Sequence, residues 1–234
     1  MKVHFIQQEE WVEPGEYLAW AKRRGLETSF TRCWLGEPVP EAVDADLLVV
    51  LGGWMCPATT PEECPTYDAA AEIRLIRRTV DSGRAVVGAC LGAQLLGEAM
   101  GAPYAHSPER EVGPVPARLT EAGRRDPLFA DFPAVFDAGA WHNDMPGLTA
   151  DSVVIAASEG CPRQIVRYAP LAYGFQTHME FTHAIVANGL RDCGGELGEG
   201  RFVQSVGQML AYDYAPMNAL LSRFLDRLLE AYRT

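Results

Sequence analysis

Apolar and polar positions follow distinct patterns along the chain, and the first half predicts alternating strands and helices. Short apolar runs bounded by turn residues predict buried strands at 2–7, 28–34, 46–51 and 85–89. Apolar positions at helical spacing predict helices at 14–24, 67–81 and 91–100. This order predicts an α/β fold with an open, mostly parallel, doubly wound sheet of the flavodoxin-like type.

The second half is richer in short strands. We expect strands at 134–137, 153–157, 164–168 and 172–176, the last three joining the sheet as added antiparallel strands. A long amphipathic helix is expected at 217–232. Because neither a repeat nor a linker interrupts these patterns, the sequence predicts a single domain over 1–234.

The balance of charge excludes several classes of partner. Acidic residues outnumber basic ones by 31 to 20, giving a net charge of −11. This surplus argues against nucleic acid or an anionic membrane as the main partner. From the polar residues that follow Ile6 we expect no signal peptide, and no apolar run is long enough to predict a membrane span. With six scattered cysteines and no C-x-x-C pair, we expect a reducing, cytoplasmic location.

The stretch around Cys90 is the first candidate for chemistry. Gly88-Ala89-Cys90-Leu91-Gly92 lies where the strand at 85–89 gives way to a helix, a G-x-C-x-G nucleophile elbow. The glycines permit a sharp turn, and the helix N-terminus favours a thiolate. The alternative is a buried, inert cysteine in a tight turn.

His178 and Glu180 supply the base and the acid that such a nucleophile needs. They are two residues apart, so on an extended backbone both side chains project from the same face. The carboxylate can then orient the imidazole of a Cys-His-acid triad. The alternatives are two surface residues at a strand end, or a metal site completed by His183. Because H-x-E-x-x-H differs from the helical zinc pattern, we expect no metal and no cofactor.

Taken together, these motifs carry a family resemblance. The chain resembles class I glutamine amidotransferases, and more narrowly stand-alone proteins similar to the glutaminase domain of GMP synthase. The resemblance spans nearly the whole chain and rests on the stretches 51–53, 88–94, 111–113, 141–144 and 174–180. It implies the open sheet of that family.

The resemblance also implies a role for each matching residue. Cys90 would attack the glutamine amide to form a γ-glutamyl thioester, while His178 moves the protons and Glu180 orients His178. The backbone amides of Gly53 and Leu91 would form the oxyanion hole. The substrate would be framed by four further residues, Met55, Gln94, Asn143 and Asp144.

The sequence departs from the family at two positions and leaves the acceptor open. Trp54 and Met179 stand where the family commonly has proline. Three functions stay open: a glutaminase that passes ammonia to a separate synthase, a free-standing hydrolase of other γ-glutamyl amides or peptides, and a non-catalytic binding module. Glutamine or another γ-glutamyl compound is the expected small molecule.

Overall fold

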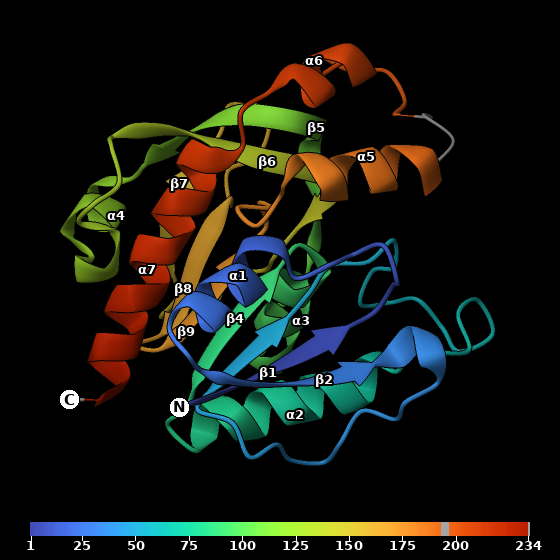
Figure 1. Ribbon diagram of the computed structural model, residues 1–234, viewed down its shortest axis with the longest axis vertical. Helices are drawn as coiled ribbons and strands as arrows, with labels where there is room; N and C mark the ends of the chain where they lie inside the picture. Colours follow the sequence, from blue (N-terminus) through green and yellow to red (C-terminus); the bar gives the residue numbers. More distant parts are fainter. Residues whose placement is uncertain (193–196, 234) are drawn as a thin grey trace.

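A computed structural model describes residues 1–192 and 197–233. Within these ranges, strands join into one ten-stranded sheet, and helices cover both of its faces (Figure 1). The strands are β1 (Lys2–Gln7), β2 (Glu27–Arg32), β3 (Leu47–Val50), β4 (Ala85–Ala89), β5 (Ala105–Leu119), β6 (Val135–Met145), β7 (Val153–Ala157), β8 (Ile165–Ala169), β9 (Ala172–Phe175) and β10 (Phe202–Val203). The helices are α1 (Gly15–Arg23), α2 (Ala69–Asp81), α3 (Leu91–Ala99), α4 (Glu121–Arg125), α5 (His183–Asp192), α6 (Val206–Ala211) and α7 (Ala215–Arg233), with short 3₁₀ turns at Cys33–Leu35 and Pro127–Phe129.

The parallel part of the sheet runs in the order β9-β4-β3-β1-β2. Its central strands are apolar on both sides, because successive residues enter two different cores. Leu47 and Val49 of β3 pack into one core, whereas Leu48 and Val50 pack into the other. This two-sided burial explains the continuous apolar run in the sequence.

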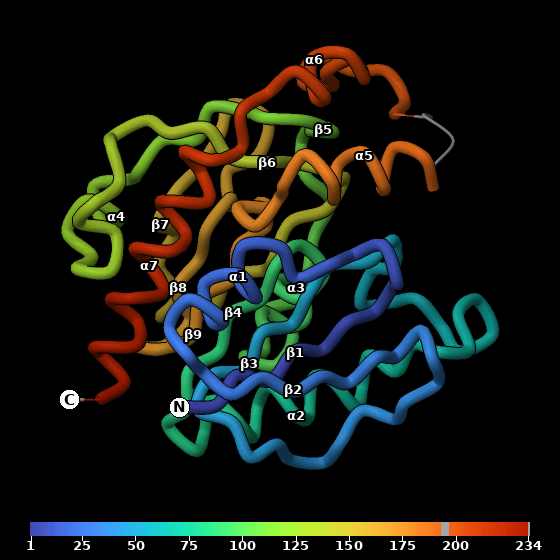
Figure 2. Tube along the Cα trace, in the orientation of Figure 1, coloured from blue at the N-terminus to red at the C-terminus, as the bar shows by residue number. Residues whose placement is uncertain are grey.

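Helices α1 and α7 cover one face, while α2 and α3 cover the other. The first pair is joined by a hydrogen bond in which Trp20 Nε1 donates to Asp226 Oδ1 over 2.8 Å. The Cα trace shows α1 and α7 on the near side of the sheet (Figure 2). The predicted doubly wound arrangement is therefore confirmed.

Antiparallel strands extend the sheet beyond β9. As predicted, β7, β8 and β9 form a meander. The long β5–β6 pair was not predicted beyond 134–137. Pro114 and Pro116 interrupt the strand pattern, yet they lie between the short segments of β5 that pair with β10 and β7. Proline is tolerated there because it lies outside those two additional ladders.

Two further observations bear on the sequence predictions. Among the described residues, no helix has the length and apolar character needed to cross a bilayer. Cysteines 33, 56, 64, 90 and 161 are free thiols. Cys193 lies outside the described residues.

Candidate active site

Cys90 lies at the carboxyl end of β4, immediately before α3. Its backbone adopts φ 51° and ψ −109°, and no other non-glycine residue in the described ranges has a positive φ. The amide of Cys90 donates to the Phe175 carbonyl over 2.7 Å, which ties the turn to the end of β9. Such a strained conformation matches the predicted nucleophile elbow.

Two glycines allow the elbow to pack closely. A Cβ on Gly88 would lie 2.2 Å from the Gly92 carbonyl oxygen, and one on Gly92 would lie 2.0 Å from the Val50 carbonyl oxygen. Neither position can accept a side chain without moving backbone. The G-x-C-x-G spacing therefore reflects contact between α3 and the strands beneath it.

His178 and Glu180 lie in the loop after β9, next to the end of β4. Strand β9 ends at Phe175, so the two residues are not on the extended backbone that the sequence predicted. A turn nevertheless brings them together, with His178 Nδ1 2.7 Å from Glu180 Oε1. A Cβ on Gly52 would lie 3.2 Å from His178 Cε1 and 3.3 Å from Cys90 Cβ, which places the imidazole beside the thiol.

The surroundings of His178 favour its charged form. Burial disfavours the imidazolium, but the negative charges of Glu180 and Cys90 and hydrogen bonds to both raise the pKa of His178 to about 10. The ring also stacks on Phe181, with centroids 4.3 Å apart, and the His178 amide donates to the Gly139 carbonyl. The imidazole is therefore held in place from several directions.

Gly53 and Leu91 lie side by side near the nucleophile. Leu91 is the first residue of α3, so its amide has no partner within the helix. A Cβ on Gly53 would lie 3.3 Å from the Leu91 side chain. Gly53 and the Leu91 side chain are therefore close neighbours, and Leu91 directly follows Cys90.

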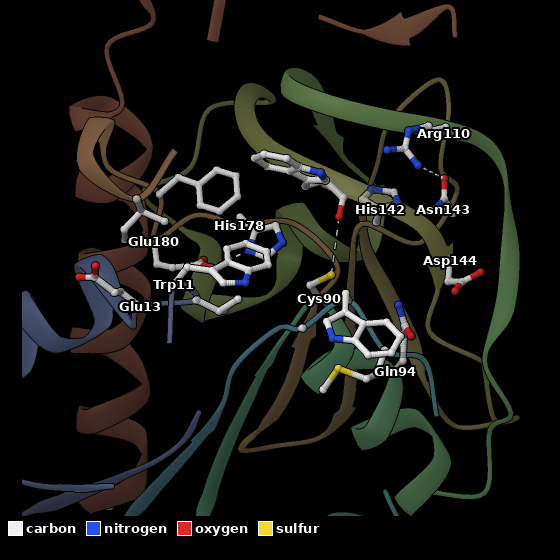
Figure 3. Close-up of a pocket in the computed structure, with 17 residues that line it drawn as sticks. Trp11, Glu13, Cys90, Gln94, Arg110, His142, Asn143, Asp144, His178 and Glu180 are labelled. Atoms are coloured by element: carbon white, nitrogen blue, oxygen red, sulfur yellow. Dashed lines mark hydrogen bonds and ion pairs between the residues drawn. The ribbon is translucent and has the colours of Figure 1, made fainter. Parts of the chain in front are cut away.

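A cavity of about 260 Å³ opens above Cys90. All the predicted site residues except Leu91 line it, including the four expected substrate contacts. Figure 3 shows Arg110, Asn143 and Asp144 on one side of Cys90, and Trp11 and Glu13 on the other. The Arg110 guanidinium donates to Asn143 Oδ1 over 2.8 Å, and His106 Nδ1 lies 2.6 Å from Asp144 Oδ1.

Several lining or supporting residues were not predicted. Gln176 is fully buried, and its Nε2 donates to Cys90 Sγ over 3.5 Å. Gln94 Nε2 in turn donates to Gln176 Oε1 over 3.2 Å. Gln176 could have been predicted, because it lies within the stretch 174–180, only two residues before His178. Arg110 and Trp11 come from distant segments and gave no comparable signal.

His183 does not join the triad. It begins α5, and its Nε2 donates to the Leu210 carbonyl over 2.9 Å. The residues His178, Glu180 and His183 therefore do not converge as the metal alternative required. This follows from the turn after β9, which directs His183 toward α6.

A second group of buried polar side chains could in principle hold a metal ion. Ligand atoms of Glu111, His142 and Cys161 all lie within 4.8 Å of one another. However, the carboxylate of Glu111 already accepts hydrogen bonds from Ser158 and Gln164. Burial also raises the pKa of the Cys161 thiol to about 11. In the described structure, by contrast, neither ring nitrogen of His142 has a hydrogen-bond partner, and His142 Nε2 lies 3.2 Å from Glu111 Oε2. His142 also lines the cavity.

The sequence model of the class I glutamine amidotransferase family matches residues 21–189. The chain belongs to this family. As in the predicted resemblance, the matched region contains the elbow cysteine and the His178–Glu180 pair.

Relatives of this class I glutamine amidotransferase include proteins that match it over its whole length. The glutamine amidotransferase-like protein YfeJ of Salmonella typhimurium is 49% identical over 99% of both chains. The crystal structure of SMU.1228c is 44% identical, covers 98% of this chain and 100% of its own, and superposes with a TM-score of 0.95. The GMP synthase of Aliivibrio salmonicida is 37% identical over 47% of this chain, a match spanning 21% of that longer protein.

Proposed function

We propose that this class I glutamine amidotransferase hydrolyses the side-chain amide of glutamine through a Cys90-His178-Glu180 triad. The observation that carries the proposal is the buried His178–Glu180 pair set beside a cysteine in a strained elbow. Nucleophile, base and orienting acid then stand in the order that covalent amide hydrolysis requires.

In the first step, the Cys90 thiolate attacks the γ-carbonyl carbon of the substrate. The tetrahedral intermediate places its oxygen toward the amides of Gly53 and Leu91. As the C–N bond breaks, the His178 imidazolium gives its proton to the leaving nitrogen, and ammonia departs from a γ-glutamyl thioester. The raised pKa of His178 supports this role, because the imidazole carries the needed proton at neutral pH.

In the second step, water hydrolyses the thioester. Neutral His178 removes a proton from water, the new C–O bond forms, and the C–S bond breaks. Glutamate leaves, and the thiolate–imidazolium pair is restored. Glu180 keeps the imidazole oriented throughout, while Gln176 stabilises the thiolate by donating a hydrogen bond to its sulfur.

The glutamyl end of the substrate binds on the side of Arg110 and Asp144. The guanidinium and the carboxylate complement the α-carboxylate and the α-ammonium of an amino acid. Gln94 Oε1 is buried with no hydrogen-bond partner in the described structure, and it accepts a hydrogen bond from the substrate. Met55 and Asn143 complete this part of the cavity.

The released ammonia goes to an unidentified acceptor, or to a separate synthase subunit. The match to a GMP synthase whose name includes glutamine hydrolysis supports such a coupling. Trp54 is 61% exposed beside the Gly52–Gly53 loop, where a partner can reach it. Free thiols and a thiolate nucleophile fit a reducing compartment such as the cytoplasm.

Release of ammonia and glutamate by the isolated chain tests this proposal. Cys90→Ala and Cys90→Ser are expected to abolish release from glutamine, and a glutamine-like diazoketone is expected to label Cys90 selectively. Cys56→Ala is the matched control, because among the described cysteines Cys56 is the one that is partly exposed. Equal labelling of Cys56, or glutamine hydrolysis that survives Cys90→Ala, would contradict the proposal. If the wild-type chain released neither ammonia nor glutamate, a non-catalytic binding module would be favoured instead.

A further inference from the structure

The cavity extends beyond the triad on the side away from Arg110 and Asp144. There it is lined by Trp11 and Glu13 (Figure 3). Two further lining residues are Phe181, which stacks on His178, and Ile185, which lies beside Gly15 at the start of α1. The leaving nitrogen must face His178 to receive its proton, so this side of the cavity accommodates the leaving group. Ammonia from glutamine would occupy only a small fraction of the space.

This wall is attached directly to the reacting groups. The Glu16 amide, at the start of α1, donates to the Glu180 carbonyl over 3.2 Å. The rings of Trp11 and Trp141 lie 6.5 Å apart, and the Trp141 carbonyl lies 3.9 Å from Cys90 Sγ. The segment that carries Trp11 and Glu13 is therefore fixed relative to the nucleophile.

The charges on this wall favour a cation. Glu13 lines the wall, and Trp54, which also lines the cavity, forms a side-chain hydrogen bond with Glu9. Besides the His178 imidazolium, which belongs to the triad, Arg110 is the only positively charged side chain among the described residues that line the cavity. Its guanidinium is held on the opposite side by Asn143 and the Leu197 carbonyl. Indole rings beside carboxylates bind ammonium groups by cation–π and ionic attraction.

We propose that this wall is a leaving-group subsite for an amine that carries a second, positively charged ammonium group. The inference rests on the proposed function and extends it from glutamine to γ-glutamyl amides of diamines. The bond that breaks joins the carbonyl carbon of the γ-carboxamide to the amide nitrogen, and His178 protonates that nitrogen. The diamine leaves in place of ammonia, and water then releases glutamate from Cys90.

The kinetics of three substrates test this subsite. They are glutamine, the γ-glutamyl monoamide of diaminobutane, and the γ-glutamyl amide of pentylamine, which replaces the ammonium group with a methyl group of similar size. We expect kcat/KM for the diaminobutane amide to exceed that for the pentylamine amide by roughly 3- to 30-fold, mainly through KM.

Two variants locate the effect. Glu13→Gln is expected to bring the ratio of kcat/KM for the diaminobutane amide to kcat/KM for the pentylamine amide close to one. Trp11→Leu is expected to reduce this ratio as well. Glu10→Gln is the matched control, because Glu10 is exposed and lies outside the cavity lining. It is expected to leave the ratio at the wild-type value.

The outcomes separate the two proposals. If glutamine is hydrolysed through Cys90 while the wild-type ratio is near one, or if Glu13→Gln leaves the ratio unchanged, the subsite is overturned and the proposed function stands. If none of the three compounds is hydrolysed in a Cys90-dependent way, both are overturned.

Discussion

His178 Nδ1 lies 2.7 Å from Glu180 Oε1 in a loop rather than on a strand. The pair is buried, with 7% and 2% of the two side chains exposed. Because water screens it little, the Glu180 carboxylate acts strongly on the imidazole. In the proposed mechanism, the proton that His178 delivers to the leaving nitrogen therefore depends on Glu180.

Glu180→Gln is expected to change the pH dependence of the reaction. Burial opposes the imidazolium, but Glu180 and Cys90 raise the pKa of His178 to about 10, so activity should fall as pH rises through that value. Removing the carboxylate charge lowers this pKa, and the alkaline limit should move to lower pH by roughly one to three units. The pH profile of kcat/KM for glutamine measures the shift. An unmoved alkaline limit would show that Glu180 does not act on His178.

Gln176→Leu is expected to weaken the nucleophile. The substitution removes the hydrogen bond to Cys90 Sγ, and a bond to a charged group contributes about 1.5–3 kcal/mol. Alkylation of Cys90 by iodoacetamide at neutral pH should slow by roughly tenfold or more. Gln176→Glu, which keeps the size but loses the donor when ionised, should slow it further. Wild-type alkylation rates in both variants would rule out this role.

Gly92→Ala is expected to prevent correct folding around the elbow. The new Cβ would lie 2.0 Å from the Val50 carbonyl oxygen, so α3 or β3 would have to move. We expect a loss of more than about 4 kcal/mol in the free energy of unfolding. Gly207→Ala is the control, because a Cβ there meets nothing within 4 Å. Thermal unfolding followed by circular dichroism distinguishes them, and equal melting temperatures would contradict the packing described here.

Glu72→Gln is expected to stabilise the protein at neutral and alkaline pH. Burial raises the pKa of Glu72 from 4.5 to about 8, although Gln8 donates a hydrogen bond to it. The pKa of Glu72 is higher in the folded state than in the unfolded state. The free energy of unfolding is therefore highest at pH values below 4.5, and it decreases as pH rises from 4.5 to about 8.

Glutamine at position 72 cannot ionise, and its carbonyl still accepts from Gln8. The variant should gain on the order of a few kcal/mol over the wild type as pH rises through this range. Chemical unfolding at a series of pH values measures the difference, with exposed Glu62→Gln as the control. A stability difference that does not vary with pH would show that burial does not raise the pKa of the Glu72 carboxyl.

The parts of the fold that follow local patterns could be predicted. The apolar run at 85–89 and the glycines beside Cys90 indicated a strand and a sharp turn, because both depend on residues close in sequence. The strand β5 could not be predicted. Its pairing with β6 depends on residues far along the chain, and Pro114 and Pro116 contradict the usual strand pattern.

The candidate site shows the same limit. Cys90, His178 and Glu180 lie in recognisable motifs, but the turn that joins the last two replaces the predicted extended backbone. Arg110 and Trp11 reach the cavity from separate segments, so only the folded chain shows that they flank Cys90 on opposite sides. From the sequence alone, an arginine and a tryptophan at these positions could equally lie on the exposed surface of the protein.

The covalent intermediate is the most direct test of the triad. The protein is mixed with glutamine, quenched in acid within one turnover, and its intact mass is measured, followed by peptide mapping. We predict a mass increase of one γ-glutamyl group on the peptide that contains Cys90, which hydroxylamine removes and which Cys90→Ala lacks. Glutamate released at the wild-type rate with no adduct on Cys90, or with the adduct on another cysteine, would contradict the account.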